Sequence, residues 1–135
     1  MLKKNRSILM MPLLAFAVSL AAAGTALAQN NCSNVDVRIK NSTPDEIKVK
    51  RFEYSDGGTW RTETGMFGVD GFQKLMPNQS VPFTRDLEHV GGSSTRIKVT
   101  YVHHIGGSKW GADRTFTTGS FTCIDGTSRL VDIIE

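Results

Sequence analysis

The strongest structural signal in this sequence is a repeated alternation of apolar and polar residues. It is clearest at 95–105, where Ile97, Val99 and Tyr101 alternate with charged and hydroxyl side chains and the same parity continues to Ile105. An alternation with a period of two is typical of a β-strand that buries one face and exposes the other. We therefore expect a strand here, with its apolar face turned toward a core.

Shorter runs of the same kind recur along the chain after residue 29. They lie near 35–40, 46–54, 60–63, 81–88, 110–116, 121–123 and 130–134. Gly, Pro, Asn and Asp residues, which favour turns, separate the runs, and no segment keeps a helical period over three turns. The pattern predicts an all-β fold, an antiparallel β-sandwich of about seven or eight short strands, with a small barrel as the alternative.

One run changes its phase. Ile47 and Val49 share one parity, whereas Phe52 and Tyr54 have the other. A change of phase within a single strand predicts a β-bulge, here near residues 50–51, because one extra residue returns the apolar side chains to the same face.

The chain contains two cysteines, Cys32 and Cys123. In an oxidising compartment an even pair is interpreted as a disulfide. The bridge would close a loop of about 90 residues and stabilise the fold by about 4–5 kcal/mol in the chain-entropy description.

The amino-terminal segment has the pattern of an export signal. Three basic residues precede an uncharged apolar run at 8–23, and the small-residue triplet Ala-Leu-Ala follows at 26–28. Pro12 and Gly24 interrupt the apolar stretch, which argues against a membrane anchor. We predict a secretory signal peptide at 1–28, with cleavage after the triplet.

The predicted mature chain, 29–135, is long enough for a single domain, and we expect a secreted or periplasmic protein without a transmembrane anchor. Three of the 16 basic residues lie in the signal, which leaves 13 basic against 13 acidic residues. The two signs are interspersed and form no basic block, so we predict no binding to nucleic acid. The sequence does not predict an oligomeric state.

The residues that most often perform chemistry form no recognisable motif. His103 and His104 are neighbours in a strand, so they point to opposite faces, and His103 on the apolar face should be a hydrogen-bonded core residue. Asp56, Asp70 and Asp125 each precede a glycine, which is typical of turns rather than of a calcium loop. Serine-nucleophile and zinc motifs are missing from the sequence. We predict no catalytic residue, no metal site and no cofactor.

Two features indicate surface recognition. The loop at 65–72 carries the apolar residues Met66, Phe67, Val69 and Phe72 where a solvated loop would be polar. This loop either closes an open end of the sandwich or forms an exposed apolar patch for a partner.

Trp60 and Trp110 lie beside glycine-containing turns, with Arg61 and Lys109 next to them. An aromatic ring with a neighbouring cation suits a sugar or a lipid headgroup, and packing in the core is the alternative.

These observations favour an exported, non-catalytic binding or structural module of the bacterial envelope or extracellular space. Its loops would recognise a protein, a glycan or a lipid surface. A membrane-active or lipid-binding protein that uses the loop at Met66 and Phe67 is one alternative. A small hydrolase, whose site forms only in the folded chain, is another.

Overall fold

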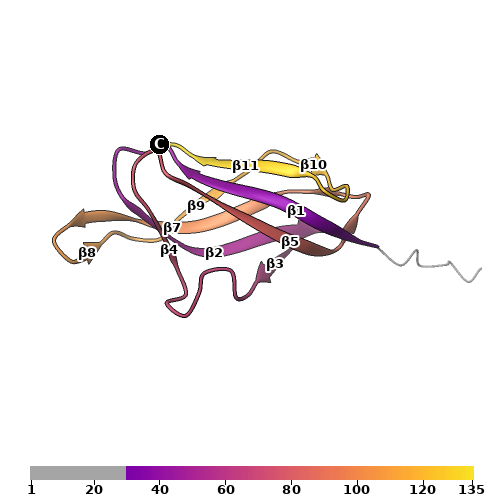
Figure 1. The fold of residues 1–135 in the computed structure, drawn as a ribbon, viewed down its shortest axis with the longest axis horizontal. Helices are drawn as coiled ribbons and strands as arrows, with labels where there is room; N and C mark the ends of the chain where they lie inside the picture. The colour runs from indigo at the N-terminus through magenta and orange to yellow at the C-terminus, as the bar shows by residue number, and fades with distance from the viewer. Residues whose placement is uncertain (1–29) are drawn as a thin grey trace, which may run out of the picture.

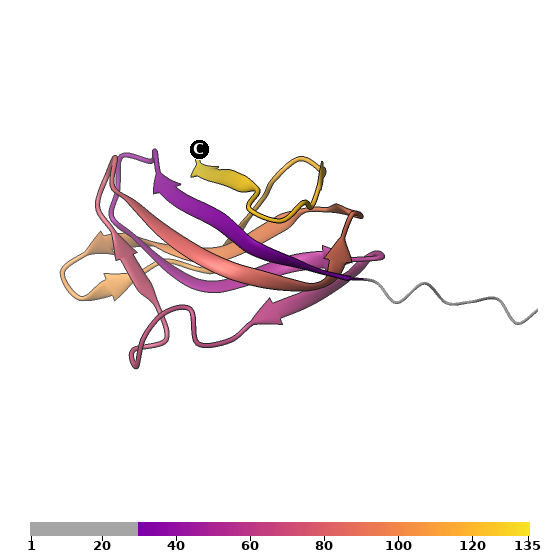
Figure 2. The same cartoon turned by 45° about the vertical axis from the view of Figure 1, so that its right-hand side comes forward.

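The computed structural model describes residues 30–135, where nine of eleven β-strands form two main sheets that pack face to face and the other two form a small separate sheet (Figures 1 and 2). This part of the chain is all-β, which confirms the predicted sandwich. The signal peptide predicted at 1–28 lies outside the described residues. Among residues 30–135 we find no helix with the length and apolar character needed to cross a bilayer.

The first sheet has three strands, with β1 (Asn30–Asn41) in the middle. On one side β1 pairs antiparallel with β5 (Ser80–Gly91), and on the other side it pairs with β11 (Ser128–Ile133). The pairing of β1 with β11 is parallel, unlike the uniformly antiparallel arrangement expected from the sequence. These strands come from opposite ends of the chain, so no hairpin forces them to run in opposite directions.

The second sheet is built on a central antiparallel pair, β2 (Ile47–Asp56) and β7 (Ile97–Gly106). Two strands pair with β2, and two others pair with β7. They are β3 (Thr59–Glu63) and β4 (Gln73–Leu75) on β2, and β8 (Lys109–Trp110) and β9 (Arg114–Thr117) on β7.

The predicted bulge in β2 is confirmed. The register of β2 against β7 shifts between Val49 and Arg51. Val49 before the shift and Phe52 and Tyr54 after it are all buried, whereas Lys50 and Arg51 are exposed. The extra residue therefore keeps the apolar side chains of both halves of β2 on the inner face.

The core lies between the two sheets and follows the alternation of the strands. In β1, Val35, Val37 and Ile39 are buried, and their neighbours in sequence are exposed or partly exposed. The parity expected for the segment 95–105 fails at three positions: Ile105 is 62% exposed, whereas Thr100 and Val102 on the opposite face are buried. The β7–β8 hairpin extends past the end of the sandwich in Figure 1, so no second layer covers Ile105.

A buried amide organises the turn between β1 and β2. The side-chain nitrogen of Asn41 donates hydrogen bonds to the backbone carbonyls of Asp45 (2.8 Å) and Leu75 (2.9 Å). Its oxygen accepts hydrogen bonds from the backbone and the hydroxyl of Thr43. Because Leu75 belongs to β4, this one side chain attaches the turn to the second sheet and satisfies polar groups that are shielded from water.

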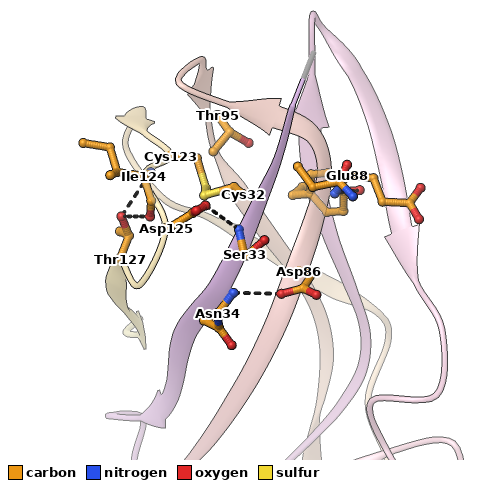
Figure 3. The surroundings of a disulfide bond; sticks show 12 residues. Cys32, Ser33, Asn34, Asp86, Glu88, Thr95, Cys123, Ile124, Asp125 and Thr127 are labelled. Atoms are coloured by element: carbon orange, nitrogen blue, oxygen red, sulfur yellow. Dashed lines mark hydrogen bonds between the residues drawn. A yellow bond between two sulfur atoms is a disulfide. The ribbon is translucent and has the colours of Figure 1, made fainter. Parts of the chain in front are cut away.

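The predicted disulfide is present. Cys32 in β1 is bonded to Cys123, which directly follows β10 (Phe121–Thr122) (Figure 3). β10 pairs with β6 (Ser94–Thr95) in a small separate sheet. Both sulfur-bearing residues are fully buried, and the bond is consistent with an oxidising environment outside the cytoplasm.

The segment that follows Cys32 is irregular and is held by two carboxylates. The register of β1 against β5 shifts between Cys32 and Val35, and Asn34 has a positive φ of 53°. The backbone N–H groups of Ser33 and Asn34 donate to Asp125 and Asp86, each at 2.8 Å (Figure 3). Asp125 thus has a structural role in satisfying the backbone near the disulfide.

Candidate binding surface

The loop at 65–72 covers part of the core rather than exposing its apolar residues. Met66 and Phe67 are 6% and 8% exposed and belong to the core cluster. The Phe67 ring packs edge-to-face on Phe83 of β5, with 5.6 Å between the ring centroids. The loop therefore joins the second sheet to the first. Val69, at its tip, is fully exposed, and Phe72 is half-buried.

Phe72 and Trp110 lie together on the outer face of the second sheet, with Lys48 between them. The Lys48 ammonium is 4.4 Å from the centroid of the Phe72 ring and 4.0 Å from that of Trp110. The centroids of the His104 and Trp110 rings are 5.1 Å apart. Val102 lines a hollow of about 270 Å³ together with Lys48, Phe72 and Trp110. These contacts cover Val102, which is the apolar residue that β7 turns outward.

Trp60 forms a second cluster of the same kind. The Lys98 ammonium is 4.3 Å from its ring centroid, and the Arg96 guanidinium is 5.4 Å from it. Lys98 also forms an ion pair of 3.1 Å with Glu53. Each tryptophan thus has cations over its ring, an arrangement that stabilises both partners while leaving part of the indole accessible.

The strand register places both tryptophans on the same face. Trp60 is paired with Ser55 of β2, and Trp110 is paired with His104 of β7. Directly paired residues project to the same side of a sheet, and both of these positions are opposite in parity to the buried core residues. From Lys48 to Ser55 along β2, a rise of about 3.3 Å per residue separates the two clusters by roughly 20 Å.

This outer face also carries unpaired positive charge. Two of its cations are neutralised, Lys98 by Glu53 and Lys50 by Asp113 at 2.7 Å. Four others have no carboxylate within ion-pair distance among residues 30–135, namely Lys48, Arg51, Lys74 and Arg96. We call this surface, defined by the three aromatic residues Trp60, Phe72 and Trp110 and by these four cations, the aromatic–cation face.

The histidines are arranged as their parity predicts. His103 is buried in the inner layer, and His104 points outward, where a ring nitrogen lies 2.8 Å from the carbonyl oxygen of Gly107. The hydrogen bond expected for His103 is not formed with any described residue; instead its ring lies between the carboxylates of Glu135 (3.3 Å) and Asp45 (4.0 Å). Within the described part of the chain, no cluster of three or more potential ligands could hold a metal ion.

Glu63 gives the fold a pH dependence. It lies on the inner side of β3, facing β5, where burial raises the pKa of its carboxyl; Glu88 and Asp86 add to the increase and Arg85 opposes it. A raised pKa in the folded state means that ionisation of Glu63 destabilises the fold, and this cost is present at neutral pH and absent in acid.

We expect Glu63→Gln to raise the melting temperature at pH 7 by a small amount, because the amide removes the desolvated charge. At a pH below the ordinary range of a glutamate, variant and wild type should melt alike. The measurement is thermal unfolding followed by circular dichroism at both pH values. Equal melting temperatures at pH 7 would show that water solvates this carboxylate well.

The structure thus places Trp60 and Trp110, the two strand residues predicted as binding residues, on one surface. The four apolar residues of the loop at 65–72 are divided between the core and the surface. The cations of the face were not predicted from the sequence. Lys48, Lys74 and Arg96 are separated in sequence, and only the pairing of β2, β4 and β7 gathers them. Outward parity within the runs 46–54 and 95–105 was the available signal for Lys48 and Arg96, whereas Lys74 lies in β4, outside every predicted run.

Comparisons with protein-family models, curated proteins and solved structures found no match to this chain.

Proposed function

We propose that this protein is an exported, non-catalytic binding module whose contact surface is the aromatic–cation face. The face is formed mainly by strands of the second sheet, so the proposed contact differs from the loop-mediated contact expected from the sequence. The β-sandwich acts as a rigid frame that fixes the relative positions of the aromatic rings before a partner binds. Such pre-organisation reduces the entropy that binding costs.

The observation that carries the proposal is the position of the two tryptophans. Trp60 and Trp110 are only partly buried on one outer face, although a β-sandwich readily buries large aromatic side chains in its core. Partly exposed aromatic residues near cations are enriched where proteins meet partners.

The disulfide supports the localisation part of this proposal. The buried Cys32–Cys123 bridge is consistent with an oxidising compartment, and the predicted signal peptide at 1–28 would deliver the chain there. We infer that the mature protein acts in the periplasm or the extracellular space. Fractionation of cells that express the protein should find the processed form there.

The lipid-binding alternative has less support. Met66 and Phe67, the residues on which it rested, are buried, and Val69 is the remaining fully exposed apolar residue of that loop. One exposed valine provides little apolar area for insertion into a bilayer. The hydrolase alternative receives no added support from the side chains of the described residues.

The binding function is tested by comparing wild type with the double variant Trp60→Ala/Trp110→Ala. The probes are immobilised polygalacturonate, immobilised dextran, and vesicles of phosphatidylglycerol or of phosphatidylcholine. We expect wild type to bind at least one probe and the double variant to lose at least tenfold in that affinity. Leu130→Ala is the matched control, because Leu130 is an exposed apolar residue of β11 in the first sheet.

Two results would contradict this proposal. The first is that wild type binds none of the four probes. The second is that the double variant, still folded by circular dichroism, binds as well as wild type. In the second case another surface must make the contact.

A further inference from the structure

Building on the proposed function, we infer that the ligand of the aromatic–cation face is an acidic polysaccharide, a chain of sugars that carry carboxylates. The polysaccharide would lie along β2 and contact both tryptophan clusters.

The charge of the face favours an acidic ligand. Lys48, Lys74 and Arg96 lie over the rings of the two aromatic clusters, and Arg51 lies between the clusters along β2. None of the four has a carboxylate partner among residues 30–135. The mature chain as a whole has equal numbers of basic and acidic residues, so this surplus is local rather than general. A local positive surplus is complementary to a ligand that carries negative charges at intervals.

The other groups on the face favour a sugar. The exposed residues Thr62, Thr115 and Thr117 project outward between the two tryptophan clusters, because their partners in the register are outward residues. Threonine hydroxyls donate and accept hydrogen bonds, as sugar hydroxyls do. The two indole rings are partly exposed, and the part of each ring that its ammonium neighbour does not cover is a flat apolar surface against which the C–H face of a sugar ring can pack.

The spacing favours a chain over a single sugar. The clusters at Trp60 and Trp110 are roughly 20 Å apart along β2, at about 3.3 Å per residue, and one sugar ring cannot reach both. A polymer that contacts both clusters binds the second one intramolecularly, which can raise its affinity by about 10²–10⁴.

The face is less suited to a bilayer. Its aromatic rings are half-buried and have ammonium groups 4.0–4.4 Å from their centroids, so they cannot enter hydrocarbon without desolvating those charges. Single-stranded nucleic acid also binds to aromatic rings and cations, but it does not present the C–H ring faces and hydroxyls that match the indoles and threonines of this face as a sugar chain does. Both occupants are included as outcomes of the test.

The test compares two forms of one polymer. The probes are polygalacturonate and its fully methyl-esterified form, which keeps the same sugar chain but lacks the charges. We expect binding to polygalacturonate to be at least tenfold tighter than to the ester, to weaken with salt, and to increase with chain length until both clusters are spanned. Isothermal titration calorimetry of the oxidised protein gives each affinity.

Two variants locate the binding site. Lys48→Gln/Lys74→Gln should weaken binding to polygalacturonate about tenfold and leave binding to the ester unchanged. Trp110→Ala should abolish the dependence on chain length. Arg38→Gln, which removes an exposed positive charge from β1 on the opposite side of the sandwich, should have no effect.

The outcomes separate the two proposals. If both polymers bind equally and Trp60→Ala/Trp110→Ala abolishes binding, the face binds glycans and the acidic class is wrong. If phosphatidylglycerol vesicles or single-stranded DNA bind as tightly as polygalacturonate, or if Arg38→Gln weakens binding as much as the lysine variants, the ligand class is also wrong. Failure to bind polygalacturonate overturns this inference, and the proposed function then depends on the dextran and vesicle results.

Discussion

Removal of the disulfide, in the variant Cys32→Ala/Cys123→Ala, is expected to lower the free energy of unfolding by about 4–5 kcal/mol. The cysteines are 91 positions apart in sequence, so the bond closes a long loop and reduces the number of conformations open to the unfolded chain. A fold of this size has a total stability of about 5–15 kcal/mol, and the loss would be a large part of it. Urea unfolding under oxidising conditions, followed by tryptophan fluorescence, gives the two free energies.

Two comparisons isolate the role of the bond. Wild type unfolded in the presence of a reductant should approach the stability of the alanine variant. Cys32→Ser/Cys123→Ser should be less stable than the alanine variant, because both positions are fully buried and the hydroxyls would lack partners. An alanine variant with the wild-type midpoint would mean that the bond is not formed, or that it does not stabilise the fold.

Phe67→Ala is expected to lower the free energy of unfolding by about 3 kcal/mol. Phe67 is 8% exposed, and its ring packs on Phe83, so truncation leaves a cavity between the loop and β5. Val69→Ala, two positions away in the same loop, is the matched control and should change the stability by less than about 0.5 kcal/mol, because Val69 is fully exposed. Thermal and urea unfolding of the three proteins provide the comparison.

This pair of variants also tests the two interpretations of the loop at 65–72. If Phe67→Ala is as stable as wild type, the loop does not contribute to the core in solution. The exposed-patch interpretation, with its lipid-binding function, would then regain support. If Phe67→Ala is destabilised as expected, the role of Met66 and Phe67 is to pack against the core. A contact with a partner would then involve other residues.

The features of the candidate surface were only partly predictable. Trp60 and Trp110 could be selected because a large aromatic residue beside a turn has two possible locations, core or surface. Nothing local to either residue distinguishes the two locations. Their partners in the strand register, Ser55 and His104, are five and six positions away, but the exposure of the rings depends on distant residues of the same face, such as Lys48, which lies more than 60 positions from Trp110.

The local pattern of the sequence was sufficient to predict which side chains share a face of a strand. The phase change between Val49 and Phe52 predicted the bulge in β2, and the opposite orientations of His103 and His104 followed from their adjacency. The cysteine pairing followed because only two cysteines are present. Each of these conclusions depends on backbone geometry over a few residues, or on simple counting, and none needs the neighbouring strand.

Tertiary structure alone decided the parallel pairing of β1 with β11, the burial of Met66 and Phe67, the exposure of Ile105, and the gathering of cations around the tryptophans. Alternation shows that two faces differ, but it does not show what covers either face. Coverage depends on contacts between segments that are distant in sequence. For this protein, residue order therefore predicted the longer strands and their inner faces, and the packing of distant strands determined which side chains remain on the surface.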